Sequence, residues 1–179
     1  MHATHAATAP SGIAGLILTG LSHAATVLAA VGMVGMSLAE GWQVFARYVL
    51  NDSPGWTEPL TLLLMTTTAM MGAAVATRRE MHFRFIALAQ VAPPRAQTVL
   101  AGFSRLVVLA IGAALAIWGW DLMADNWAIA MPGTALPEGL NYLPLSLGGA
   151  LIALFALERL LVPPTTPAPA TPAPVIVED

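Results

Sequence analysis

Residues 12–39 read GIAGLILTGLSHAATVLAAVGMVGMSLA, a stretch without a single charged side chain. Helix-compatible sequence continues from Glu40 to about Leu50. At about 1.5 Å per residue, a helix over 12–50 would be roughly 58 Å long, nearly twice the ~30 Å thickness of the hydrocarbon core of a membrane. We therefore predict a first membrane-crossing helix over about 12–50 that tilts, bends or projects from the bilayer.

The composition of the whole chain is that of a membrane protein. Of its 179 residues 57% are hydrophobic and 9% are charged, with a mean hydropathy of +0.73, whereas an ordinary soluble domain has about 25% charged residues. The apolar runs lack the alternation of a barrel strand, and a backbone in lipid must satisfy its own hydrogen bonds, so we predict an all-α integral membrane protein. The net charge of −3 comes without a basic cluster, which excludes a nucleic-acid partner.

Three further apolar stretches predict three further transmembrane helices, over about 58–78, 96–120 and 140–162, so that the membrane domain covers 12–162. Thr57 stands where it can cap the first of these helices. Between the second and third helices, residues 80–91 mix arginines with apolar residues, which predicts a short amphipathic helix at the cytoplasmic interface. We expect residues 1–11 to form a cytoplasmic tail, and the Pro-rich residues 163–179 to form a second, disordered one.

Two features of the second helix bear on its packing. Small residues recur there at three- and four-residue spacing, a pattern that lets helices approach closely in lipid: Ala69, Gly72, Ala73 and Ala76. The consecutive threonines at 66–68 have two interpretations. Their hydroxyls either bond to carbonyl groups one turn earlier or line a substrate path.

Arginine alone sets the orientation, because the chain has seven basic residues and no lysine. All of them except Arg47 fall at one end of the predicted helices: Arg78, Arg79, Arg84, Arg95, Arg105 and Arg159. The positive-inside rule makes that end cytoplasmic. We therefore expect a multi-pass protein of the bacterial inner membrane with both termini in the cytoplasm, and with Arg78, Arg79 and Arg84 anchored to lipid headgroups.

An ionisable side chain at membrane depth is costly unless it is paired or hydrated, so it is a candidate functional residue. The sequence offers Glu40, Arg47 and Arg105. Glu40 either makes a structural polar contact or, in a self-sufficient small exporter, couples proton movement to export. Arg105 lies near enough to the cytoplasmic end for its side chain to extend to the interface.

Enzymatic and cofactor-binding motifs are missing from the sequence. It has no cysteine, no HExxH motif, no phosphate-binding glycine loop and no Ser/His/Asp set at a suitable depth. A bis-histidine haem needs two histidines at one depth on facing helices, and only His23 and His82 lie near the membrane. We expect a protein without enzymatic activity, cofactor or metal. The membrane anchor of a respiratory enzyme, with a haem or quinone site, is the remaining alternative of this kind.

Two motifs are more specific than the composition. Residues 43–51, QVFARYVLN, together with Trp56-Thr57-Glu58 resemble the junction of the first two helices in the small membrane subunit of TRAP transporters, the DctQ-like family. Residues 72–79, GAAVATRR, with His82 close behind, resemble that family's small-residue run, basic pair and histidine at the cytoplasmic end of its second helix. The chain departs from the family at Pro59, where a second acidic residue is usual.

The resemblance implies a subunit rather than a complete transporter. In that family the small subunit joins a large membrane permease that binds sodium and substrate, while a periplasmic binding protein delivers an organic acid. The small subunit scaffolds the permease and carries no transport site. The implied partners are therefore the large permease and the periplasmic binding protein, to which the arginines add membrane lipids.

The junction of the first two helices brings Arg47, Trp56 and Glu58 close together in sequence. We expect Arg47 and Glu58 to form a partly shielded ion pair across the turn. We expect Trp56 to lie at the outer interface and fix the depth of the helix. The alternative is that all three are independent interfacial residues.

The predicted orientation can be tested by cysteine labelling, because the chain has no native cysteine. Single cysteines in place of Arg84 and Asp125 should react with a membrane-impermeant reagent from opposite sides of the membrane. In intact cells with a permeabilised outer membrane, we expect the cysteine at 125 to react and the cysteine at 84 to remain unlabelled. Labelling of both positions in intact cells would contradict the topology.

Overall fold

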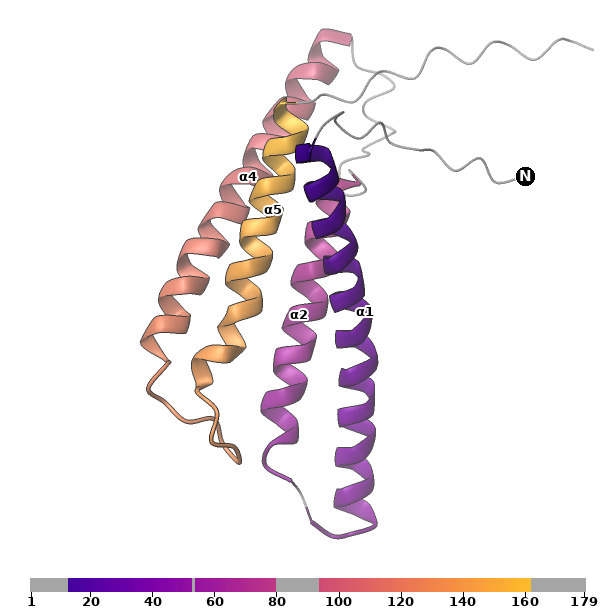
Figure 1. Cartoon of the computed structure of the whole chain (residues 1–179), viewed down its shortest axis with the longest axis vertical. Coiled ribbons are helices and arrows are strands. Elements are labelled where there is room, and N and C mark those ends of the chain that lie inside the picture. The colour runs from indigo at the N-terminus through magenta and orange to yellow at the C-terminus, as the bar shows by residue number, and fades with distance from the viewer. Residues whose placement is uncertain (1–12, 53, 80–93, 162–179) are drawn as a thin grey trace, which may run out of the picture.

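The computed structural model describes residues 13–52, 54–79 and 94–161, and these residues are helical apart from their loops (Figure 1). The long helices are α1 (Ile13–Tyr48), α2 (Thr57–Arg78), α4 (Pro94–Asp125) and α5 (Leu143–Leu161), and a short 3-10 helix, η1 (Glu138–Tyr142), precedes α5. The four long helices are long and apolar enough to cross a membrane, which confirms the predicted all-helical fold with four candidate spans. The expected interfacial helix over 80–91 and the tails over 1–11 and 163–179 lie outside the described residues.

Some helix ends differ from the sequence prediction. Thr57 is the first residue of α2 rather than its cap. Its hydroxyl donates to the Pro54 carbonyl oxygen at 2.8 Å, and the cap position falls to Trp56, whose side chain makes no capping hydrogen bond. At the far side of the chain, α4 continues to Asp125. These shifts leave the number of spans unchanged.

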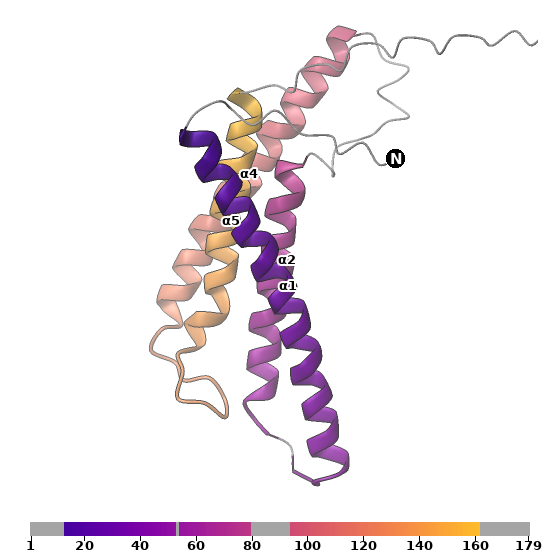
Figure 2. The ribbon, with the colours of Figure 1, turned by 45° about the vertical axis from the view of Figure 1, so that its right-hand side comes forward.

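The helices stand in an open row, in the order α1, α2, α5, α4 (Figure 1). Two antiparallel hairpins, α1–α2 and α4–α5, each pack internally, and contacts between α2 and α5 join one hairpin to the other. Within the described ranges, α1 and α4 make no substantial contact and form the two ends of the row. Figure 2 shows α1 crossing α2 at an angle. Near the N-terminal end of α1, Leu18 and Leu21 reach a cluster of Ala74, Ile152 and Phe155 between α2 and α5.

Small side chains let α1 and α2 approach each other. The buried face of α1 includes four small residues at seven-residue intervals: Ala25, Gly32, Ala39 and Ala46. A Cβ atom on Gly32 would lie 2.5 Å from the hydroxyl oxygen of Thr68. The threonines at 66–68 each donate their hydroxyl to the carbonyl four residues earlier, as the first of their two interpretations predicts. The hairpin thus packs through small residues and hydroxyls satisfied within their own helix.

The α1–α2 hairpin has a regular register. Thr19 lies beside Arg78, at 3.1 Å between the hydroxyl oxygen and Nη2, and Ala29 lies beside Thr68, at 3.3 Å between the carbonyl and hydroxyl oxygens. Ten residues along α1 therefore match ten residues along α2 in the opposite direction. Continuing the register by ten residues places Ala39 level with the first turn of α2.

The α4–α5 hairpin depends on glycine. A Cβ atom on Gly149 would lie 2.5 Å from the backbone nitrogen of Ala116 and 2.9 Å from the carbonyl oxygen of Gly112. A Cβ atom on Gly119 would lie 2.7 Å from the backbone nitrogen of Ser146. Because lipid provides no hydrophobic drive for helices to associate, this close approach supplies the van der Waals contact that holds α4 against α5.

Gly149→Leu should therefore separate the two helices of this hairpin. Overpacking typically costs about 1–3 kcal/mol, and here the obstacle is backbone, so we expect the free energy of unfolding to fall by at least that much. The measurement is unfolding by SDS titration in mixed micelles. Gly102→Leu on α4 is the matched control, because a Cβ atom there meets nothing within 4 Å. Equal stability of the two variants would contradict the proposed packing.

Candidate functional site: an arginine junction of three helices

Arg78, in the last turn of α2, connects three helices. Its Nε donates to Glu158 Oε2 of α5 at 3.1 Å, and its Nη2 donates to Glu158 Oε1 at 3.4 Å. The same Nη2 lies 3.1 Å from Thr19 Oγ1 of α1 and donates to it. The guanidinium carbon lies 5.6 Å from the centre of the Phe155 ring. We call Arg78, Glu158 and Thr19 the arginine junction.

Arg159 of α5 adds a second guanidinium group beside the junction. Its Nε donates to the carbonyl oxygen of Arg78 at 2.9 Å, and its Nη2 donates to the same oxygen. That carbonyl belongs to the last turn of α2, where carbonyl groups lack partners within the helix and a positive charge is favourable. The end of α2 is therefore bound to α5 through both its side chain and its backbone.

The ion pair between Arg78 and Glu158 is shielded, with 14% and 9% of the two side chains exposed. In such surroundings the attraction between the charges is strong, but leaving either charge unpaired is very costly. The pair therefore acts as a geometric constraint, because α2 and α5 must meet here to satisfy both charges. Since the guanidinium engages both carboxylate oxygens, the arrangement serves structure rather than acid–base chemistry.

The junction differs from the sequence prediction in two ways. The sequence predicts Arg78 at the lipid surface, whereas the structure turns its side chain inward to Glu158. Sequence reasoning also missed Glu158, although a carboxylate in an apolar helix is the same signal that singled out Glu40. Its neighbour Arg159 and its place near the end of the last helix hid that signal. Arg79, the next residue along, is exposed.

Near the C-terminal end of α1, far from the arginine junction, Glu40 and Arg47 stay outside the packed face of the helix. Each follows a buried alanine, Ala39 or Ala46, by one residue, which turns its side chain about 100° away from α2. Both residues are exposed. Because Ala39 is level with the first turn of α2, Glu40 lies near the end of the span and not at its centre.

The predicted ion pair between Arg47 and Glu58 is wrong. In the part of the chain that the structure describes, Arg78 and Glu158 form the salt bridge, and Arg47 and Glu58 do not. The register places Glu58 beside Ala39, and Arg47 is eight residues further along α1, about 12 Å beyond the start of α2. Trp56 is 40% exposed at the cap position of α2, and its contact with the membrane interface stays a prediction.

Glu58 instead lines a cavity of about 210 Å³ where the loops of the two hairpins meet, together with Glu138 and Asn141 of η1. The Oδ1 atom of Asn141 is buried without a hydrogen-bond partner. Gly133, with φ 71°, brings the loop before η1 against Gly55, and a Cβ atom on it would lie 2.5 Å from the Gly55 carbonyl carbon. The hairpins thus touch through their loops as well as through α2 and α5.

The sequence also singles out His82 and Arg105. His82 lies outside the described residues. Arg105 lies half-buried on α4. Across residues 13–52, 54–79 and 94–161, no group of three or more His, Cys, Asp or Glu side chains could hold a metal ion.

Four candidate spans in an open row, tied by one shielded ion pair, define a multi-pass helical membrane protein. Residues 36–163, well over half of the chain, match the family described as "Tripartite ATP-independent periplasmic transporters, DctQ component". The chain therefore belongs to this family of TRAP transporter small permease subunits, which confirms the resemblance seen in its motifs. The family is a transporter component and not an enzyme, and its tripartite system implies a DctM component and a periplasmic DctP component as partners.

Two relatives illustrate the membership. The chain is 24% identical over 119 residues to the sialic acid TRAP transporter small permease protein SiaQ of Vibrio cholerae, covering 66% of this chain and 69% of the relative. It is 25% identical over 126 residues to a putative TRAP transporter small permease protein of Haemophilus influenzae, covering 70% and 78% of the two chains.

The arginine junction predicts a specific pattern in a double-mutant cycle. Removing one partner of a shielded pair strands the other charge, so Arg78→Leu and Glu158→Leu should each lower the free energy of unfolding by on the order of 3 kcal/mol. The double variant should lose much less free energy of unfolding than the sum of the two single losses. Arg79→Leu, an exposed neighbour, should stay within about 0.5 kcal/mol of the wild type. Strictly additive losses in SDS titration would show that the pair does not act as a unit.

Proposed function

We propose that this chain is the small permease subunit of a sodium-coupled, binding-protein-dependent uptake transporter for organic acids. It binds the large membrane permease and scaffolds it, and it carries no transport site of its own. It spans the bacterial inner membrane four times with both termini in the cytoplasm. Family membership and the six arginines gathered at one end of the predicted helices support this proposal.

The observation that carries the proposal is the open row of helices. In the most apolar part of each span, the buried share runs from 6% in α4 to 33% in the last span. A helix pair that enclosed a substrate path would place unsatisfied polar groups between its helices. Most polar groups described between these helices are instead satisfied, as in the threonines at 66–68 and the arginine junction. Within the described long helices, the buried hydroxyl that lacks a partner is that of Thr61, in the second turn of α2. Two broad apolar faces suit attachment to a larger membrane partner.

The position of Glu40 bears on the exporter alternative. A self-sufficient proton-coupled exporter needs a carboxylate within the span that alternates between the two sides of the membrane. Glu40 is exposed at the level of the first turn of α2, away from every helix interface of the row. That placement favours the scaffold over the exporter. The other alternative, a respiratory membrane anchor, predicts visible absorbance from a haem in the purified protein.

Reconstitution separates these functions. Liposomes that contain the chain alone should show neither sodium-driven nor proton-driven solute flux. Liposomes that contain the chain, the large permease and the binding protein should take up an organic acid when sodium is supplied outside. Glu40→Gln should leave this uptake unchanged. Flux through the chain alone, abolished by Glu40→Gln, would overturn the scaffold proposal in favour of the exporter.

A further inference from the structure

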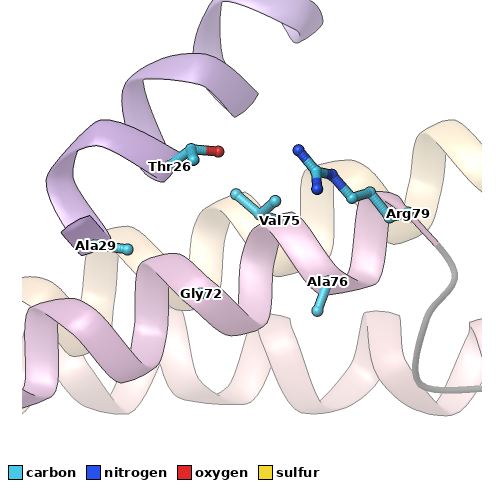
Figure 3. A pocket seen from close by; sticks show the side chains of 6 residues that line it. All are labelled: Thr26, Ala29, Gly72, Val75, Ala76 and Arg79. Carbon is cyan, nitrogen blue, oxygen red and sulfur yellow. The ribbon is translucent and has the colours of Figure 1, made fainter. Parts of the chain in front are cut away.

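An open groove of about 240 Å³ lies between α1 and α2, near the arginine junction (Figure 3). Two residues of α1, three residues of α2 and the C-cap residue of α2 line it: Thr26, Ala29, Gly72, Val75, Ala76 and Arg79. Its walls are almost entirely apolar. The hydroxyl of Thr26 donates to the Ser22 carbonyl oxygen at 2.8 Å, so a molecule in the groove need not supply a hydrogen-bond acceptor for it.

The groove exists because small residues of α2 have no helix against them. The sequence predicts close helix packing at Gly72 and Ala76, yet a Cβ atom on Gly72 would meet nothing within 4 Å. The neighbouring helices approach other faces of α2, α1 at Thr68 and α5 at Met70. The chain therefore leaves an apolar recess on the outside of the row.

Arg79 supplies a positive charge at the rim of this recess. Figure 3 shows its guanidinium and the hydroxyl of Thr26 extending toward each other from opposite sides of the groove. Unlike Arg78, Arg79 is exposed, and its side chain makes no ion pair or hydrogen bond with the residues that the structure describes. Gly72 is seven residues from Arg79, about 10 Å deeper, which lies within one leaflet of a ~30 Å hydrocarbon core.

We propose that this groove is a binding site for an anionic phospholipid. Arg79 binds the phosphate, and one acyl chain lies over Gly72 and Ala76. This site goes beyond the scaffold function and does not depend on it.

A helix of a partner protein is the rival occupant, because small residues four positions apart also seat helices in lipid. The shape of the recess favours the lipid. Met33 lies seven residues after Thr26 on α1, and Met65 lies seven residues before Gly72 on α2, so both share the faces that line the groove. Their side chains are 61% and 50% exposed. The lining residues beside α2 run only from Gly72 to Arg79, about two turns, and the bulky methionines lie beyond them. A recess of this length suits a thin, flexible acyl chain better than a second helix. The cation at the rim complements a phosphate.

The test uses the full chain, purified in mild detergent and titrated with dioleoylphosphatidylglycerol under native mass spectrometry. Arg79→Gln should weaken lipid binding about fivefold, the factor that corresponds to the ~1 kcal/mol contributed by one arginine near anionic headgroups. Gly72→Leu should weaken it at least as much, because leucine fills the groove without a clash inside the fold. Dioleoylglycerol, which has the same chains without the phosphate, should bind wild type and Arg79→Gln equally.

Two matched variants control for charge and bulk. Arg47→Gln removes an exposed arginine at the far end of α1, and Gly20→Leu adds leucine to α1 where a Cβ atom meets nothing within 4 Å. Both should bind phosphatidylglycerol as the wild type does. Equal binding of phosphatidylglycerol by all four variants would overturn the proposed site. If Gly72→Leu and Arg79→Gln keep their lipid but lose co-purification with the large permease, the groove seats a partner helix and the proposal is likewise overturned.

Discussion

The two hairpins of this chain join through α2 and α5, and the shielded pair of Arg78 and Glu158 fixes where that happens. Neither charge is tolerable alone so near to lipid, so the pair requires the end of α2 to lie against the end of α5. The rest of the row follows from this contact. Thr19 brings α1 to the same guanidinium, and the glycines at 112 and 149 hold α4 on the other side of α5.

A row differs from a closed bundle in what it exposes. A closed bundle buries one face of every helix around a common core, whereas a row leaves two broad apolar faces open along its whole length. That surface is costly in water and natural in lipid, and it offers a wide area to a larger membrane protein. The two ends of the helices also differ in chemistry. One end holds the arginine junction and the groove below Arg79, and the other holds exposed Glu40 and the loops that meet at Gly133.

Hydropathy and motifs were enough to predict an all-helical membrane protein with four spans and its family. Hydropathy and motifs could not predict the lateral order of the helices, because that order depends on which small residues face which neighbouring helix. Gly149 faces Ala116, for example, whereas Gly72 faces open space. The prediction of an ion pair between Arg47 and Glu58 was wrong for a related reason. Closeness in sequence across a turn does not fix register, and α1 extends about two turns past the start of α2. Glu158 could have been found, since it is the one carboxylate of the apolar helix α5.

The distance between α1 and α4 tests the open row most directly. The distance between spin labels at Val34 on α1 and Ile117 on α4, both exposed, can be measured by double electron–electron resonance in nanodiscs. Packed helices are about 8–10 Å apart, and α2 and α5 stand between the labelled helices. The open row therefore predicts a separation above about 20 Å. A distance near 10 Å, one interhelical spacing, would place α1 beside α4 in a closed bundle and contradict this account.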